Sequence, residues 1–324
     1  MVRIEFTVEL NYEVSAPGAD FIFNIHAART ARQAVAAERL VLSQPIDSTV
    51  QTDPSGRNRH LRLRAQPGAL CVKYQATVDI DHDCAEPASL AQVPVGELPP
   101  DALACLYPSR YCQSDRLIRL AGEEFGALRP GYPRALAIQQ WVRDRVTFAS
   151  NTSNSATSAL DTLVERVGVC RDFAHLMIAL CRAVNIPARF VSGTDFGADP
   201  ALGPPDFHAY VEAYLGHRWV IFDPSETAIP MGLVRLGTGR DAADVAFATI
   251  FGSVATHAPV ITMRAVEDPV RGFVMPRHRR DALSTDTGLL NVPVLHQGRP
   301  SADTRPQARR PQSPQQPIHL RSTS

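Results

Sequence analysis

Three residues in the middle of the chain have the types and the order of a nucleophilic set: Cys170, His208 and Asp223. Cys170 follows Gly168-Val169 directly, and the apolar residues after it recur at helical spacing. The cysteine is therefore expected at a helix N-terminus, where unpaired backbone N–H groups and the helix dipole favour a thiolate over a thiol. A buried core cysteine is the alternative that this position alone leaves open.

The histidine and the carboxylate lie on a predicted β-hairpin. His208 and Asp223 belong to two runs rich in aromatic and β-branched residues, separated by a short break that contains Gly216. A two-residue turn at Leu215-Gly216 places His208 directly opposite Asp223, whereas a turn one residue later places the two diagonally. Either register puts both side chains on the same sheet face, because side chains alternate along a strand with a period of two.

Together these groups have the chemistry of covalent catalysis. Cys170 would attack a carbonyl carbon, His208 would take up and return the proton, and Asp223 would fix the imidazole tautomer and stabilise its charged form. Taken singly, His208 also fits a satisfied strand histidine and Asp223 an Asp-Pro turn, but the combination favours catalysis. Asp172 and His175 are expected to be structural. An acid in the first turn complements the helix dipole, and the histidine would lie alongside Cys170 on the same helix.

Longer stretches of sequence around these residues carry a family resemblance. They are Gly168-Val169-Cys170-Arg171-Asp172-Phe173-Ala174-His175, Asp206-Phe207-His208-Ala209-Tyr210-Val211-Glu212 and Trp219-Val220-Ile221-Phe222-Asp223-Pro224, with further runs at 108–112 and 239–246. The chain resembles the bacterial transglutaminase-like (papain-like cysteine protease) superfamily over residues 1–275, including a β-rich N-terminal region. The resemblance implies a triad of Cys170, His208 and Asp223 on a transglutaminase core, in which the nucleophile-bearing helix packs on an antiparallel sheet. It assigns no chemical role to residues 239–245, which are expected to be structural.

The N-terminal region has the patterning of β-structure. Residues 2–14 alternate between apolar and polar side chains, which predicts a half-buried antiparallel strand. Further short strands are expected at 21–26, 38–42, 60–65 and 69–80. Many short strands with polar turns predict a small β-sandwich. The expected fold class is therefore α+β, with the sandwich ahead of the transglutaminase-like core.

Composition changes along the chain predict four segments. Residues 1–84 form the β-rich domain, and the Pro-rich stretch 85–100 is a linker. Helical patterning begins at 101, and the catalytic core is expected over 101–275. Residues 276–324 are rich in Arg, Pro, Gln and Ser, and they have too little apolar surface to fold alone, which favours a disordered tail over a basic interaction tail.

Composition also narrows the classes of partner. The formal net charge is 0, so no global field favours nucleic acid or an anionic membrane. The six cysteines show neither zinc-ligand spacing nor the pattern of a disulfide scaffold. The N-terminus resembles a strand and not a signal sequence, and no stretch approaches the ~20 apolar residues of a membrane span. We expect a cytoplasmic protein with no metal and no cofactor, acting on a protein or peptide substrate, with its oligomeric state open.

The leading functional prediction is cysteine-dependent acyl chemistry on peptide or isopeptide amides through a thioester at Cys170. Hydrolysis of the thioester is favoured over transamidation, because nothing in the sequence marks an amine-binding pocket. The Cys170 backbone N–H is the expected oxyanion donor, and the loop at Asn151 is the candidate for a second one. The main alternative is a catalytically silent binding module with the same fold. An acyl-CoA-dependent arylamine-type transferase lacks a visible phosphate-cradling loop, and a metalloenzyme lacks partner ligands for His208.

Overall fold

The first strand of the chain organises one sheet of a β-sandwich. The structure is a computed structural model that describes residues 1–56, 58–198 and 205–286. Strand β1 (Val2–Val14) buries every second residue, as the sequence predicts, and pairs along its full length with β6 (Gly68–Ile80). Strand β3 (Gln33–Leu42) extends the sheet beyond β6. The other edge of β1 is covered by β15 (Val254–Thr256) and β16 (Val260–Val266).

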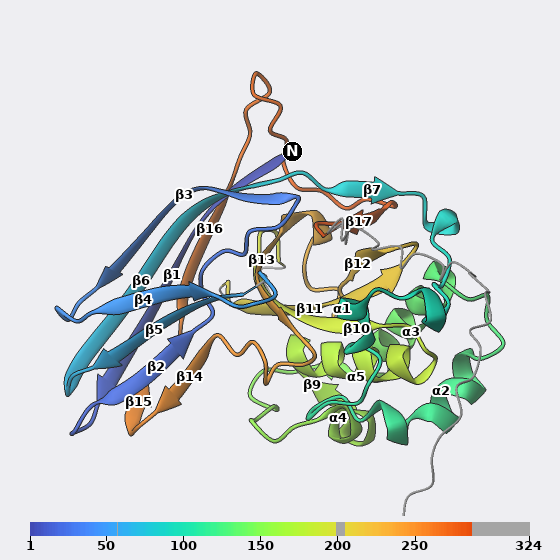
Figure 1. The fold of residues 1–324 in the computed structure, drawn as a ribbon, viewed down its shortest axis with the longest axis horizontal. Helices are drawn as coiled ribbons and strands as arrows, with labels where there is room; N and C mark the ends of the chain where they lie inside the picture. Colours follow the sequence, from blue (N-terminus) through green and yellow to red (C-terminus); the bar gives the residue numbers. More distant parts are fainter. Residues whose placement is uncertain (57, 199–204, 287–324) are drawn as a thin grey trace, which may run out of the picture. The chain divides into compact units, whose positions relative to one another are not determined.

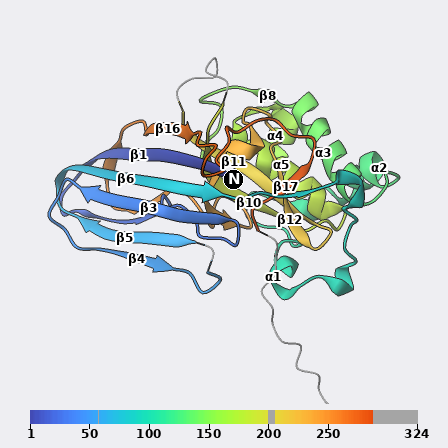
Figure 2. The same ribbon diagram turned by 90° about the horizontal axis from the view of Figure 1, so that it is seen from above.

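A second antiparallel sheet completes the sandwich. Its order is β14 (Ala248–Phe251), β2 (Ala19–Phe23), β5 (Arg59–Ala65) and β4 (Ser48–Thr52). The inward side chains of both sheets share one apolar core, and the two layers lie side by side in Figures 1 and 2. The predicted N-terminal sandwich is thus present, but it is not made from N-terminal residues alone.

The boundaries of the predicted segments differ from the structure at two places. Strands β14 to β16, which the sequence places inside the core segment 101–275, pair instead with β1 and β2. In addition, β17 (Ala282–Ser284) pairs with β7 (Asp83–Ala85), so ordered structure extends past the predicted boundary at 275. Strand pairing between distant segments leaves no local pattern, which is why the composition did not reveal it. The rest of the predicted tail, 287–324, lies outside the described residues.

The helical part surrounds one buried helix, α5 (Cys170–Ala183). Its residues 172–182 are all buried, and it packs against helices of its own layer and against the sheet that carries the hairpin. The surrounding elements are η1 (Pro87–Ser89), η2 (Val95–Glu97), α1 (Pro100–Leu103), η3 (Ser114–Arg116), α2 (Ile118–Phe125), α3 (Tyr132–Arg145), α4 (Ala159–Glu165) and the parallel pair β8 (Thr147–Phe148) and β9 (Val167–Gly168). None of the helices in the described residues is long and apolar enough to cross a membrane.

A four-stranded antiparallel sheet lies between α5 and the sandwich. Its order is β12 (Arg218–Phe222), β11 (Phe207–Leu215), β10 (Ala188–Asp195) and β13 (Leu233–Gly239), with η5 (Pro230–Gly232) leading into β13. Alternate residues of β11 enter different cores: Val211 packs with α5, whereas Tyr210 packs with the sandwich. The sheet is therefore buried on both faces. The described part of the protein has the predicted α+β fold class (Figure 1).

Candidate active site

The first turn of α5 fixes the position of the candidate nucleophile. Cys170 is the first residue of α5, as the sequence predicts. The Val169 backbone N–H donates to Asp172 Oδ2 at 2.9 Å, so the acid caps the helix at this point. Gly168 makes this possible, because a Cβ there would lie 2.7 Å from the Cβ of Asp172. The N–H of Cys170 belongs to the first turn, where backbone N–H groups have no acceptor within the helix.

The two cysteines of α5 have different environments. Cys170 is partly exposed, whereas Cys181, farther along the same helix, is fully buried. Burial raises the pKa of the Cys181 thiol to about 12. Cys181 is therefore a core thiol, and Cys170 is the one that a reagent can reach.

The hairpin adopts one of the two predicted registers. Leu215 pairs with Arg218, so the turn residues are Gly216 and His217, with φ of 54° and 61°. Positive φ at both positions is the geometry of a type I′ turn, which suits the twist of a hairpin. In this register His208 and Asp223 are diagonal neighbours on one face, and His208 Nε2 lies 3.3 Å from Asp223 Oδ1.

A set of hydrogen bonds holds the Asp223 carboxylate. Ser225 donates to Oδ1 from its backbone N–H at 3.1 Å and from its hydroxyl at 2.6 Å. The Ala228 backbone N–H donates to Oδ2 at 3.0 Å. Burial acts to raise the pKa of Asp223, but the charge of His208 and these donors outweigh it, so the pKa is lowered. Asp223 is therefore ionised at neutral pH.

The imidazole of His208 lies between Asp223 and Cys170. Burial acts to lower the pKa of His208, but Asp223 and the neighbouring Cys170 side chain outweigh it and raise the pKa well above 6.5. The contact with Asp223 is an ion pair rather than a well-aligned hydrogen bond. Since Nε2 faces Asp223, Nδ1 is the nitrogen left for the thiol. The structure thus brings the three predicted site residues together.

The segment 239–245, to which the sequence analysis assigned no chemical role, makes a hydrogen bond that helps to hold α5 in place. The Ala242 N–H donates to His175 Nε2 at 3.1 Å, and the Tyr111 N–H donates to Asp241 Oδ2 at 2.9 Å. His175 is fully buried and stacks on Tyr111 with 4.9 Å between ring centroids. Burial, then the charges of Arg171 and Arg182, lower its pKa well below 6.5. A neutral histidine that accepts a backbone hydrogen bond supports the helix and stands apart from the His208 pair.

A buried ionic cluster on the same sheet was not predicted. Arg189 Nε donates to Glu212 Oε2 at 2.7 Å, and Arg235 donates to the other oxygen of Glu212. Asp286 lies 2.7 Å from Arg189, whose guanidinium also covers the ring of Trp219 at 4.1 Å from its centroid. Charged residues within apolar strands are the signal that could have indicated a buried ionic cluster. The sequence does not show which of them pair, because the partners come from strands far apart in the sequence.

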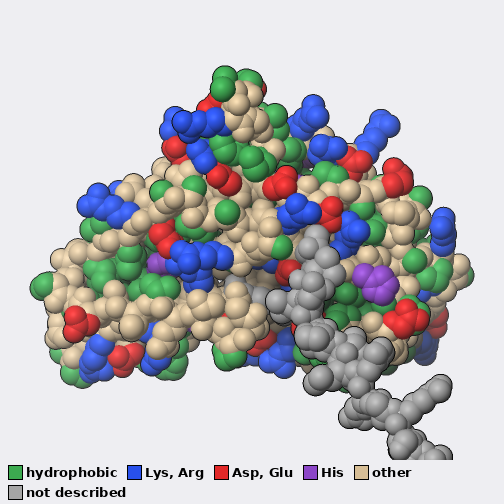
Figure 3. Space-filling view, turned by 45° about the horizontal axis from the view of Figure 1, so that its top comes forward, with side chains coloured by type: hydrophobic (Ala, Val, Ile, Leu, Met, Phe, Trp, Pro, Cys, Tyr) green, Lys and Arg blue, Asp and Glu red, His purple; other side chains and the backbone are tan. Residues whose placement is uncertain are grey.

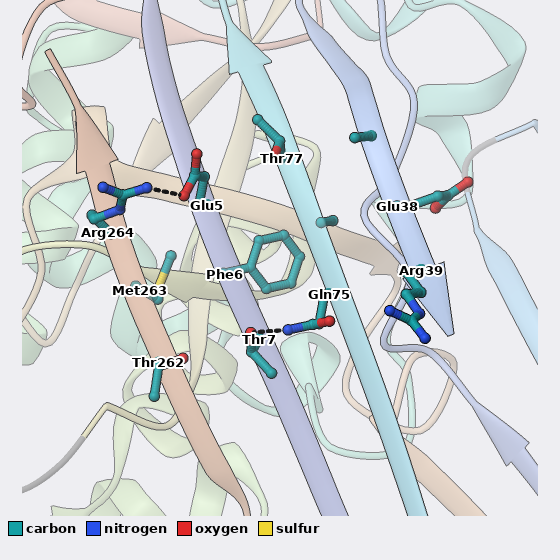
Figure 4. A pocket seen from close by; sticks show the side chains of 12 residues that line it. Glu5, Phe6, Thr7, Glu38, Arg39, Gln75, Thr77, Thr262, Met263 and Arg264 are labelled. Carbon is teal, nitrogen blue, oxygen red and sulfur yellow. Dashed lines mark hydrogen bonds and ion pairs between the residues drawn. The ribbon is translucent and has the colours of Figure 1, made fainter. Parts of the chain in front are cut away.

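A cavity adjoins the acid of the site. It has a volume of about 350 Å³ and reaches Asp223 from the side of α3, with Tyr132, Phe222 and Met231 among its lining residues. A larger hollow of about 420 Å³ lies on the outer face of the N-terminal sheet, where Glu5 and Arg264 form an ion pair (Figure 4). That hollow contains none of the predicted site residues, so size does not identify the site here.

Within residues 1–56, 58–198 and 205–286, no three His, Cys, Asp or Glu side chains form a group that could hold a metal ion. Arg and acidic side chains are interspersed on the face shown in Figure 3. Asn151, the candidate for a second oxyanion donor, is exposed with φ of 65° in the turn before α4, and among the described contacts none links it to Cys170.

A cysteine at a helix start, facing a His–Asp pair on an antiparallel sheet, defines a papain-like or transglutaminase-like class of protein. Two family models match the chain: the transglutaminase-like superfamily over residues 119–224, and the N-terminal domain of bacterial transglutaminase over residues 2–101. The chain belongs to the bacterial transglutaminase-like superfamily.

One solved structure and several curated proteins are similar to this chain. The crystal structure of a "putative cysteine protease" from Cytophaga hutchinsonii is similar over 87% of this chain and 97% of that chain, with 41% identity and a TM-score of 0.80. An uncharacterized protein of Mycobacterium leprae is 29% identical over 145 residues, which are 44% of this chain and 52% of the relative. One of Mycobacterium tuberculosis is 34% identical over 110 residues, 31% of this chain and 35% of the relative. The chain thus spans about half or less of the curated relatives it matches.

These likenesses support cysteine-based acyl chemistry in general.

Proposed function

We propose that this protein is a cysteine-dependent enzyme that cleaves peptide or isopeptide amides through a thioester at Cys170. The observation that carries the proposal is the position of His208, adjacent to Cys170 and 3.3 Å from Asp223 through Nε2. The raised pKa of His208 favours an imidazolium, which pairs with a thiolate before the substrate arrives.

The first half of the reaction forms the thioester. The Cys170 thiolate attacks the carbonyl carbon, a C–S bond forms, and the carbonyl π pair moves to the oxygen. The N–H of Cys170 at the start of α5 is placed to donate to that oxyanion. When the intermediate collapses, the C–N bond breaks and the imidazolium of His208 gives its proton to the leaving amine.

The second half releases the acid product. Water attacks the thioester carbonyl, and neutral His208 takes the proton from that water. The C–S bond then breaks and the thiolate leaves, which restores the thiolate–imidazolium pair. Asp223 holds the imidazole at its Nε2 edge in both halves, since its own position is held by Ser225 and Ala228. We favour hydrolysis over transamidation because the reaction then needs no binding site for a second substrate.

Thiol reactivity tests the proposal without a known substrate. The rate of iodoacetamide labelling is measured from pH 5 to pH 10 by mass spectrometry of peptides, in the wild type and in His208→Ala. Cys84, which is exposed, serves as the internal reference thiol in the same sample. We expect Cys170 to react much faster than Cys84 near pH 6, and we expect the advantage to disappear in His208→Ala.

The same measurement distinguishes the enzyme from the main alternative, a catalytically silent binding module. Equal labelling of Cys170 and Cys84 at every pH, with no dependence on His208, would contradict the enzyme proposal and leave a binding module. If Cys170 is activated, screening of peptide and isopeptide libraries follows, with Cys170→Ser as the inactive control. Release of free acid supports hydrolysis, whereas products joined to an added amine support transamidation.

A further inference from the structure

A third carboxylate lies beside the His208–Asp223 pair. Asp195 is the last residue of β10. The ladder between β10 and β11 sets Gly193 opposite His208 without a register shift, so Asp195 lies two residues beyond Gly193 on the same face as His208. Diagonal neighbours of this kind have side chains roughly 7 Å apart at Cβ, within reach of one another.

The position opposite His208 has no side chain. A Cβ at Gly193 would meet the Val234 carbonyl oxygen at 2.5 Å and a ring carbon of Tyr210 at 3.1 Å. The residue there is therefore restricted to glycine by close packing. No side chain from position 193 can then lie between the Asp195 carboxyl group and the imidazole of His208.

Asp195 differs from the other buried acids around the site in having an unsatisfied oxygen. The residue is only 6% exposed, and Oδ2 makes no hydrogen bond within the described residues. In Asp172, Asp223 and Asp241, by contrast, both carboxylate oxygens accept hydrogen bonds. A buried carboxylate oxygen without a hydrogen bond is costly unless a nearby charge compensates for it. The interacting charges are His208, which favours the ionised form, and Asp223, which opposes it.

We propose that Asp195 is a positioning residue whose charge, together with that of Asp223, stabilises the imidazolium of His208 and so the thiolate–imidazolium form of the site. This inference rests on the proposed function. Three groups then face the imidazole: Asp223 from the end of β12, Cys170 from α5 and Asp195 from β10. Because Asp223 and Cys170 account for the two ring nitrogens, Asp195 acts through its charge and not through a hydrogen bond.

The sign of the effect follows from linkage. Burial raises the pKa of Asp195, the charge of His208 lowers it and that of Asp223 raises it, with a net upward shift. Once ionised, Asp195 favours the charged imidazole, so it keeps the pKa of His208 higher than Asp223 alone would. Removing this charge should move the deprotonation of His208 to lower pH by about 0.5 to 1 unit, since the charge is buried but lies beyond direct contact.

The test compares two substitutions, each of which removes one negative charge from a different position. Asp195→Asn keeps the shape of the side chain, and Asp206→Asn removes an exposed carboxylate at the neighbouring strand start. The readout is the titration midpoint of the His208 imidazole by NMR of histidine-labelled full-length protein, assigned by comparison with His208→Ala. The pH profile of Cys170 alkylation is measured in parallel. We expect a downward shift in Asp195→Asn, none in Asp206→Asn, and the wild-type midpoint restored in Asp195→Glu.

The possible results test the role of Asp195 and the proposed function separately. An unshifted His208 midpoint in folded Asp195→Asn would overturn this inference, even if Cys170 proves activated. Should the Asn variant not fold, Asp195→Ser must give the same downward shift for the inference to stand. A wild-type Cys170 that reacts like Cys84 would instead remove the proposed function, and the NMR titration would still decide whether Asp195 acts on His208.

Discussion

The N-terminal sandwich and the sheet that carries the hairpin differ in where they place charged side chains. In β1 the polar residues alternate outward and form ion pairs at the surface, such as Glu5 with Arg264. In β10 every residue is buried, and Arg189 finds its partners Glu212 and Asp286 inside the protein. A sheet exposed on one face can place charges in water, whereas a sheet covered on both faces must pair them internally.

This difference has a consequence for function. In the proposed reaction, attack by Cys170 and protonation of the imidazole both create or move charge, and charges interact more strongly where water is excluded. The buried sheet provides that environment for His208 and Asp223, each of which is largely buried and shifted in pKa in the direction that favours its charged form. The sandwich, by contrast, supplies apolar cover for one face of that sheet.

The largest expected effect comes from breaking the internal ion cluster. In Glu212→Gln, Arg189 and Arg235 lose the carboxylate that both contact, and one buried positive charge is left uncompensated. We expect a loss of about 3 to 5 kcal/mol in the free energy of unfolding, measured by urea denaturation. A loss below about 1 kcal/mol would mean that Asp286 alone compensates both guanidinium groups and that the two sheets differ less than we infer.

A smaller effect is expected at the start of α5. Gly168→Ala forces a Cβ against the side chain of Asp172, which should cost about 1 to 3 kcal/mol of stability. Because the cap of the helix shifts with it, alkylation of Cys170 near pH 6 should slow on the order of tenfold. Gly122→Ala is the matched control: it lies in α2 with open space around its Cβ, and it should be neutral or stabilising. Equal behaviour of the two variants would contradict the role of Gly168.

The pH dependence of stability should reveal the buried pair. The pKa of His208 is raised in the folded state, so its stabilising contribution is fully present below pH 6.5 and is lost as pH rises through the raised value. The difference in unfolding free energy between wild type and His208→Gln should therefore be constant at low pH and shrink toward alkaline pH, by about 1.4 kcal/mol for each unit of pKa shift. A difference that grows with pH would show that the pKa has the opposite shift.

The smallest effect is expected on the outer face of the sandwich. Glu5→Ala removes a partly exposed ion pair with Arg264, and it should change the unfolding free energy by about 0 to 1 kcal/mol. Added salt should reduce even that change, because surface charges are screened. A cost comparable to that of Glu212→Gln would remove the contrast between the two sheets.

Much of the site could be predicted from sequence because its signals are local. Helical periodicity after Cys170 located the start of α5, and the break at Gly216 located the hairpin that carries His208. The relation between His208 and Asp223 was limited to two registers, and the structure adopts the one with the turn at Gly216 and His217. The catalytic roles of these residues stay a prediction until reactivity is measured.

Other features could not be predicted, because they depend on pairing between distant segments. Residues 248–266 were assigned to the core, yet they complete both sheets of the sandwich. Arg189, Glu212, Arg235 and Asp286 gave no sign of sharing one cluster. No local pattern marks Asp195, and only the pairing of Gly193 with His208 places it beside the imidazole.

By itself, the sequence located the first strand, the helix that begins at Cys170 and the hairpin, and it indicated which residues could supply a nucleophile, a base and an acid. Those properties follow from periodicity and from local backbone chemistry, which depend only on residues close together in the sequence. Only the tertiary structure decided the register of the hairpin, the strands that close the sandwich and the charges that surround His208. Strand pairing and burial join residues far apart in the sequence, and their energies depend on neighbours that no local pattern specifies.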